Sequence, residues 1–347
     1  MDKNLENSPL NELLNLEKMR KEFKAKGSKR VSKAISMVFS VFFVFAIGLS
    51  IVLHDFFGSN GVILGVAALL LVGYYTYKSY LKEYEEEDKL SFSNKYKDFY
   101  LKKYINSLGF EYAKRGKIER SEIIASSLFD YKFHTSCGND LVVGKVDNVD
   151  FTFCDLELKL LDWEDEKTGE EYETTIFQGL FFVADFHKNA KASIIVVPTP
   201  KNTINASRAF TYDSLTDIVE TLNNTVAKNG YKKIKMDNSE FNDEFSVFGA
   251  DTQQTMYVLT PAFMERILRL KRLMKSPISL SFLANKIFIK IDHGYDSFEP
   301  DLNKSIISAN IAPRIKAELN AMFDIVKILK LNSKIWIVRR SDEPNFL

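Results

Sequence analysis

The sequence predicts an α+β protein with a two-helix hairpin at its N-terminus. Residues 34–53 and 61–77 are apolar runs without a charged residue, separated by a short polar stretch at 54–60. From residue 140 onward, apolar and polar residues alternate in short segments, as in half-buried β-strands. Apolar residues recur at helical spacing around 92–108 and 263–273. We therefore expect antiparallel sheets and packed helices to follow the hairpin.

The two apolar runs are predicted to be transmembrane helices. At about 1.5 Å per residue, runs of this length can cross a hydrocarbon core of roughly 30 Å. Lys and Arg are abundant in 18–33 and recur at Lys78 and Lys82, whereas the connecting stretch has none. Basic residues favour the cytoplasmic side, so we expect a two-pass protein of the bacterial inner membrane with both termini in the cytoplasm. A signal peptide and a buried hairpin of a soluble protein are the alternatives.

Composition and periodicity divide the chain into five parts. These are a basic cytoplasmic arm at 1–33, the transmembrane hairpin at 34–80, a helical connector at 81–130, a first antiparallel β-rich block at 131–200 and a second α+β block at 201–347. The connector has helical periodicity up to Gly109 and again at 118–129. The acidic run at 83–88 marks the point where the second apolar run has ended.

The first β-rich block reads as a meander. Strands are expected at 140–145, 151–161, 172–185 and 193–198, with a turn at Asp147 and Asn148. Within 151–161, Phe151 and Phe153 share one face, whereas Leu156 and Leu158 have the opposite parity. An extra residue near Cys154 or Asp155 would restore a single buried face, so we predict a β-bulge there.

The second block is expected to alternate helices with strands. A helix is predicted at 214–227, and Thr260 and Pro261 resemble an N-cap followed by proline at the first position of a helix over 261–275. Strands at 278–282 and 286–291 are predicted to pair around 283–285. A final helix carrying apolar residues from Ile307 to Ile325 would close the core, and two sheet-bearing halves are the expected arrangement.

Short blocks of sequence occur in a fixed order over residues 121–291. They are Ser127-Leu128-Phe129, Gly138-Asn139-Asp140, Gly144-Lys145, Phe153, Glu157-Leu158, Phe177-Gln178-Gly179-Leu180-Phe181, Val247-Phe248-Gly249, Asp251, Leu259-Thr260-Pro261-Ala262-Phe263-Met264 and Leu280-Ser281-Phe282. In order and spacing these blocks resemble a bacterial family of membrane proteins, the domain of unknown function 3137, sometimes labelled galanin-like. The resemblance implies a membrane-associated protein without an assigned activity or catalytic residues.

Candidates for metal or catalytic chemistry are few. His134 and Cys137 have the spacing of a ligand pair that Cys154 and His187 could join, but no second paired element accompanies them, so no metal site is predicted. The two cysteines are expected to stay reduced and to pack as small apolar side chains. Motifs for nucleotide binding and for an activated nucleophile are absent from the sequence. An enzyme would need an unrecognised site among His134, Cys137, Asp155, Glu157 and His187.

The helix predicted over 261–275 carries a basic face. Candidate lipid contacts on it are Arg266, Arg269, Arg272 and Lys275. On a module held close to the inner leaflet, such a helix can rest on anionic headgroups. The alternative is that its apolar stripe packs on the sheet while the basic residues face water and favour the helix C-terminus.

The expected function follows from these observations. A net charge of +1 gives no overall field for nucleic acid, and the charge-free spans lack the ionisable groups of an ion path. Gly48 and Gly65 suit close helix contacts, including those of a homo-oligomer. We expect a membrane-anchored cytoplasmic binding or scaffold module that engages the bilayer and a protein or anionic-lipid partner, without cofactor or catalysis. A membrane-anchored enzyme is the alternative.

Overall fold

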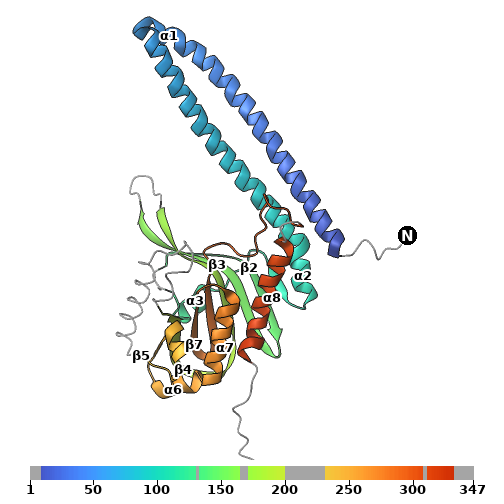
Figure 1. Ribbon diagram of the computed structural model, residues 1–347, viewed down its shortest axis with the longest axis vertical. Coiled ribbons are helices and arrows are strands. Elements are labelled where there is room, and N and C mark those ends of the chain that lie inside the picture. The colour runs from blue at the N-terminus through green and yellow to red at the C-terminus, as the bar shows by residue number, and fades with distance from the viewer. Residues whose placement is uncertain (1–8, 130–132, 165–170, 200–230, 308–310, 332–347) are drawn as a thin grey trace, which may run out of the picture. The chain divides into compact units, whose positions relative to one another are not determined.

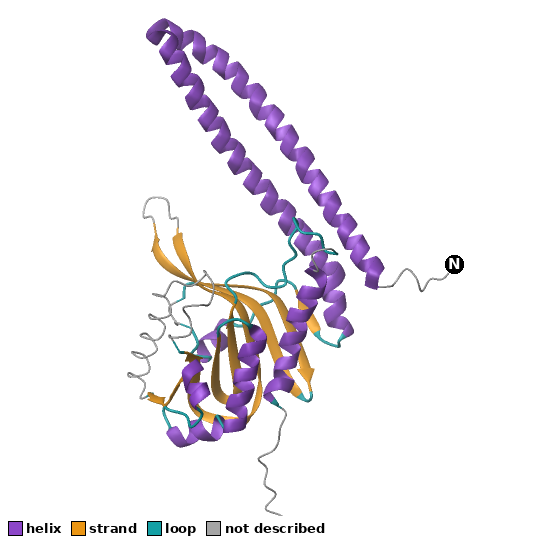
Figure 2. Ribbon diagram, in the orientation of Figure 1, coloured by secondary structure: helices purple, strands orange, loops and turns teal. Residues whose placement is uncertain are grey.

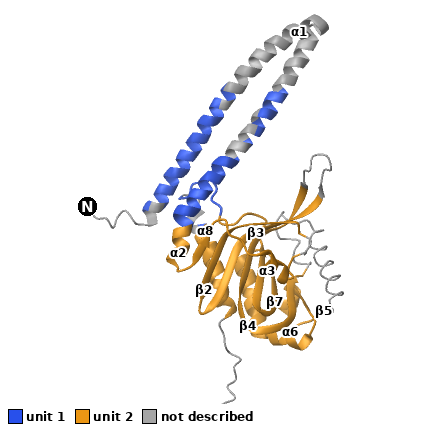
Figure 3. Cartoon of the chain, turned by 180° about the vertical axis from the view of Figure 1, so that it is seen from behind, with its two compact units in different colours: residues 1–101, 299–314 blue, residues 102–298, 315–347 orange. Residues whose placement is uncertain are grey.

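The computed structural model describes residues 9–129, 133–164, 171–199, 231–307 and 311–331 (Figure 1). The chain forms two compact units (Figure 3). The first comprises residues 1–101 with 299–314, and the second residues 102–298 with 315–347. The predicted helix at 214–227 lies outside the described residues.

Shorter helices and strands follow one very long helix (Figure 2). The helices are α1 (Pro9–Tyr96), the π-helical turn η1 (Lys97–Leu101), α2 (Lys102–Ser107), α3 (Arg120–Ala125), α5 (Ser239–Glu244), α6 (Thr252–Val258), α7 (Pro261–Met274) and α8 (Ile311–Leu329). The strands are β1 (Glu111–Ala113), β2 (Thr135–Val146), β3 (Val149–Glu164), β4 (Glu171–Pro198), β5 (Lys232–Ile234), β6 (Phe245–Gly249) and β7 (Ile278–Asp292).

The two ends of α1 lie side by side in the first unit (Figure 1). Arg30 and Asp88 form an ion pair at 3.3 Å, and the rings of Phe23 and Phe92 are 6.0 Å apart. Arg30 and Asp88 are 58 residues apart, which in a straight helix would separate them by about 87 Å. The chain therefore reverses direction between them. Ser59 lies midway in sequence between Arg30 and Asp88, inside the polar stretch at 54–60.

The segment that follows residue 299 is hydrogen-bonded to the start of α1. Arg20 donates a hydrogen bond to the carbonyl of Leu302 at 3.0 Å, and Glu17 accepts one from the backbone N–H of Ile306 at 2.9 Å. Glu17 and Arg20 pair with each other at 2.7 Å, and this hydrogen bond lowers the pKa of Glu17. These charge-assisted bonds join two parts of the first unit that are far apart in sequence.

The predicted membrane spans at 34–53 and 61–77 fall largely on residues whose side chains are not described. Within the described part of the chain, no helix offers a segment long and apolar enough to span a bilayer. The structure gives an α+β fold with an antiparallel sheet and helices, and the membrane crossing stays a prediction from the sequence.

In the part of the second unit that the structure describes, seven strands form one antiparallel sheet in the order β1-β2-β3-β4-β6-β5, with β7 also paired to β4. Strand β4 is the centre of the sheet. Its first half lies between β3 and β7, and its second half pairs with β6 and β7. Strands from both predicted blocks therefore share one sheet instead of two sheet-bearing halves, because β4 extends beyond the end of its pairing with β3.

The long strands β4 and β7 replace shorter predicted elements. The segments predicted at 172–185 and 193–198 are parts of β4, with irregular register between Asp185 and Ile194. The predicted pairing of 278–282 with 286–291 is wrong, since both segments belong to β7 and Ala284 has a positive φ of 51° at the expected turn. Both halves of β7 find partners on β4, which removes the need for them to pair with each other.

The turn between β2 and β3 is confirmed, but the predicted bulge in β3 is wrong. Asp147 and Asn148 have φ values of 50° and 65°, as a two-residue type I′ hairpin requires. Strand β3 keeps regular register with β4 from Phe151 to Leu158. The irregularity lies in β2, between Asn139 and Val142.

Strand β3 needs no bulge near Cys154 because both of its faces are buried there. Phe153 packs against Phe323 of α8, with ring centroids 5.9 Å apart. Leu156 and Leu158, on the other face, belong to a buried cluster that includes Ile123 of α3. The opposite parities of the phenylalanines and leucines thus serve two cores, one on each side of the sheet.

Local helix signals are largely confirmed. Helix α7 begins at Pro261 with Thr260 as its N-cap, as predicted. Helix α2 is followed by Gly109, whose φ of 83° favours glycine. Helix α8 is described from Ile311, later than the predicted start at Ile307.

Candidate functional site

The apolar stripe of α7 packs on the sheet, as the second of the two interpretations of this helix predicts. The ring of Phe263 lies 5.8 Å from that of Phe282 on β7 and 5.7 Å from that of Phe186 on β4. The buried residues of α7 are Phe263, Met264, Ile267, Leu268 and Leu270. The packing orients the helix, so that Arg269 and Arg272 are exposed. This arrangement places Arg269 and Arg272 on the solvent-facing side of the helix.

A groove of about 610 Å³ lies between α7 and α8, and all of its lining residues belong to the second unit. It is lined by Arg269, Arg272, Leu273, Asp324, Lys327 and Ile328. Its volume falls within the usual range for small-molecule sites. Three cations, one carboxylate and two apolar side chains therefore face the same space.

The structure brings two of the four predicted lipid-contact residues into this groove. Arg269 and Arg272 line it. Arg266 is half-buried and donates a hydrogen bond to the carbonyl of Leu329 at 3.4 Å, near the end of α8. Lys275 is exposed at the C-terminus of α7 but does not line the groove. Lys327 of α8 was not predicted, because the pairing of α7 with α8 is a tertiary feature.

The cations of the groove differ in their partners. Arg272 forms an ion pair with Glu240 of α5 at 2.5 Å, and Lys327 lies 3.6 Å from Asp324 one turn earlier. Arg269 makes no hydrogen bond or ion pair with any residue that the structure describes. Its guanidinium offers a planar fork of donors suited to phosphate or carboxylate. Arg269 is therefore the most available anion-binding group of the groove.

The five residues named for an enzyme do not form one site. Cys137 and Glu157 are directly opposite each other on β2 and β3, and Glu157 accepts a hydrogen bond from Thr175 at 3.0 Å. His134 and His187 are exposed, the latter on β4 beyond its regular pairing with β3. Asp155 is buried. The structure thus pairs Cys137 with Glu157, places Asp155 two residues before Glu157 on the same strand, and leaves the two histidines exposed.

The two cysteines are free thiols with different surroundings. Cys154 is fully buried as an apolar packing residue, as predicted, and burial raises its pKa to about 12. Cys137 is exposed, which contradicts the expectation that it would be packed. Cys154 lies on the face of β3 that carries Leu156 and Leu158 and belongs to the same buried cluster, whereas Cys137 lies opposite Glu157, which has the other parity.

A maleimide reagent is expected to label Cys137 but not Cys154 in the native protein at neutral pH, since only an accessible thiolate reacts. Mass spectrometry of the intact protein should show one adduct before unfolding and two after unfolding in urea. The Cys137→Ser variant is the control and should gain no adduct while folded. Rapid labelling of that folded variant would contradict the buried position of Cys154.

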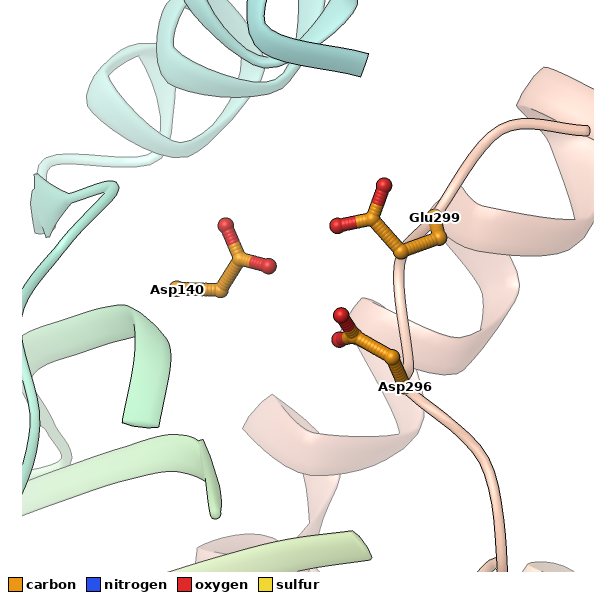
Figure 4. A group of neighbouring side chains, drawn as sticks. All are labelled: Asp140, Asp296 and Glu299. Carbon is orange, nitrogen blue, oxygen red and sulfur yellow. The ribbon is translucent and has the colours of Figure 1, made fainter. Parts of the chain in front are cut away.

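A cluster of three carboxyl groups escaped the sequence-based predictions. Asp140 lies in the bulge of β2 with a φ of 53°, Asp155 lies on β3 opposite Asn139, and Asp296 lies in the loop after β7. Oxygens of Asp140 and Asp296 are within 4.8 Å of one another (Figure 4). Glu299, also drawn there, belongs to the first unit. A β-bulge commonly redirects a side chain in this way, and aspartate tolerates the left-handed conformation.

Hydrogen bonds hold the cluster in place. Tyr112 donates to Asp140, the amide of Asn139 donates to Asp296 at 3.2 Å, and the backbone N–H of Ser297 donates to Asp155. Burial, followed by the nearby charge of Asp296, raises the pKa of Asp155 to about 8. Asp155 is therefore mostly protonated at neutral pH, and the cluster carries less negative charge than its composition implies.

The cluster can share protons and can offer oxygen ligands. Hard cations such as Ca²⁺ take six to eight oxygens, of which Asp140 and Asp296 supply a converging pair. Sequence spacing could not have found the cluster, since Ser297 and Asp155 are 142 residues apart. The only local hint is that Asp140 ends one of the short blocks noted above.

Fold and groove together define an α+β module in which a cationic groove lies on one face of an antiparallel sheet, in a chain that also carries a helical hairpin unit. Residues 175–331 match the family described as "Protein of unknown function (DUF3137)". The match confirms the resemblance seen in the short blocks. It covers the chain from the first half of β4 to the end of α8, and so includes the groove and Asp296.

Other comparisons add little. No curated protein matches the sequence. Among solved structures, the crystal structure of the mycobacterial trehalose monomycolate transport factor A, TtfA, is similar over 65% of this chain and 92% of that chain, at 6% identity and a TM-score of 0.32. This likeness is too low to bear on function.

Proposed function

We propose that the protein is a membrane-anchored binding module of the bacterial inner membrane, with both termini in the cytoplasm. The hairpin at 34–80 is the anchor, and the sheet unit engages a protein or anionic-lipid partner at the inner face of the membrane. The observation that carries the proposal is the groove between α7 and α8, where Arg269 has no partner among the described residues.

The anchor is supported by the pairing of the two ends of α1. The contacts of Arg30 with Asp88 and of Phe23 with Phe92 require the chain to reverse around the polar stretch at 54–60. This reversal places the charge-free runs 34–53 and 61–77 on opposite arms. Two arms of this length and composition suit a two-pass anchor.

A binding role is favoured over an enzyme because the candidate chemical groups are scattered. Asp155 is buried, Cys137 is exposed, and His187 lies on β4 beyond its pairing with β3, whereas catalysis needs its groups in one accessible site. The exposed basic face of α7 instead suits recognition of an anion.

Arginines placed in the apolar runs test the anchor. In cells, the parent protein is expected in the membrane fraction after alkaline carbonate extraction. The double variant Val44→Arg with Ala67→Arg should be released, because each central arginine costs about 3 kcal/mol on insertion. Leu14→Arg, outside both runs, is the matched control and should remain bound. Release of the parent chain, or retention of the double variant, would contradict the proposal.

A reporter protein fused after Leu347 tests the orientation. Activity of this reporter only outside the cytoplasm would contradict the orientation.

A further inference from the structure

The groove between α7 and α8 has the chemistry of a phosphate site. Arg269 and Arg272 come from α7 and Lys327 from α8, so cations face the space from both sides. A guanidinium binds two phosphate oxygens with parallel hydrogen bonds, and a lysine adds a point charge. Among the described residues, Asp324 supplies the one carboxylate of the lining, and Lys327 partly offsets its charge.

Arg269 is not needed for the structure around it. A cation near a helix C-terminus often serves the last carbonyl groups. At the end of α8, those carbonyls already accept hydrogen bonds from Arg266 and from the backbone N–H groups of Lys330 and Leu331. At the end of α7, the carbonyl of Lys271 accepts one from the backbone of Lys275. The guanidinium of Arg269 is therefore left for a ligand.

The groove also offers an apolar surface beside its cations. Leu273 is 45% exposed, and Ile328 is half-buried. Apolar side chains next to cations suit a ligand that joins a phosphate to a less polar part, as a phospholipid does. Inorganic phosphate alone would use only the charged part of the groove.

We propose that this groove binds a phosphate group, with Arg269 as its main ligand and Arg272 and Lys327 beside it. The inference deepens the proposed function and rests on it for the source of the phosphate, which is the headgroup of an anionic phospholipid. Of the four lipid contacts predicted on α7, the inference keeps Arg269 and Arg272. Arg266 donates its hydrogen bond to the backbone of α8, and Lys275 lies outside the groove.

The test is calorimetric titration of the full chain in non-ionic detergent with two probes, glycerophosphoglycerol and inorganic phosphate. We expect both to bind. Arg269→Gln should weaken each affinity roughly tenfold or more, since a charge-assisted hydrogen bond contributes at least that factor. The affinities of Arg269→Lys should lie between those of the parent and those of Arg269→Gln, because lysine keeps the charge and lacks the planar guanidinium.

Lys275→Gln is the matched control, with the same charge change at the end of the same helix. Its affinities should stay within about twofold of the parent values. Asp324→Asn removes the carboxylate that repels phosphate and should strengthen binding by about twofold to fivefold, a gain that misfolding cannot produce.

Three results would overturn the inference. They are an unchanged affinity in Arg269→Gln, an equal loss in Lys275→Gln, and no binding of either probe. Binding of inorganic phosphate without glycerophosphoglycerol would keep the phosphate site and overturn the lipid source. Because the titration is made in detergent, its outcome does not depend on membrane insertion. Failure of the anchor and failure of the groove can therefore be told apart.

Discussion

The Asp155→Asn variant is expected to be more stable than the parent protein at pH 8 and about equally stable at pH 4. Burial and the nearby charge of Asp296 raise the pKa of Asp155 from 3.8 to about 8 in the folded protein. Asparagine keeps an oxygen that can accept the hydrogen bond from the backbone N–H of Ser297. Unlike aspartate, it never has to carry a buried charge.

The sign follows from proton linkage. Between about pH 4 and pH 8, folded Asp155 holds a proton that the unfolded chain has released, so the free energy of unfolding of the parent falls as the pH rises. The slope is at most about 1.4 kcal/mol per pH unit, and the full difference is on the order of 5 kcal/mol. Urea denaturation of the full chain at several pH values, in detergent, measures this difference.

Glu157→Gln is the control, because it removes a carboxylate from the same strand at a partly exposed position. Its unfolding free energy should lack the gain at pH 8 that is expected of Asp155→Asn. If Asp155→Asn were less stable than the parent at pH 8, an ionised Asp155 would have to be stabilised in the fold. That result would contradict the raised pKa.

Sequence predicted the elements that depend on local chemistry. Thr260 and Pro261 start α7, and Asp147 and Asn148 form the turn between β2 and β3, because caps and tight turns are set by neighbouring residues. The bulge was misplaced because the parity of β3 was read against one core. Strand β3 has two buried faces, one covered by α8 and the other by α3, and neither helix is adjacent to β3 in sequence.

The candidate site shows the same limit. Arg269 and Arg272 were found from the helical spacing of α7, whereas Lys327 and Asp324 enter the groove only through the packing of α8. The carboxyl cluster was missed for a related reason. The loop after β7 carries Asp296 back to β2 and β3, and no pattern in the sequence reports the register of β7 on β4 that places this loop.

Gly179→Ala is expected to destabilise the fold by about 3 kcal/mol or more, which is large for a single added methyl group. Gly179 lies on β4 opposite Asp292 at the end of β7. A Cβ atom there would overlap the carbonyl oxygen of Ile291 and approach the backbone nitrogen of His293 to 2.9 Å. Both are main-chain atoms, so relief requires the end of β7 to move away from β4.

Gly109→Ala is the matched control for the same chemical change. No atom lies within 4 Å of the new Cβ, and the substitution carries only the penalty of a left-handed φ of 83°, about 1 kcal/mol. Urea denaturation of both variants should therefore separate a close backbone approach from a conformational preference. Equal losses of unfolding free energy in the two variants would mean that the end of β7 moves away from Gly179 at little cost. The loop that carries Asp296 would then be held by its hydrogen bonds to Asn139 and Asp155, and not by the end of β7.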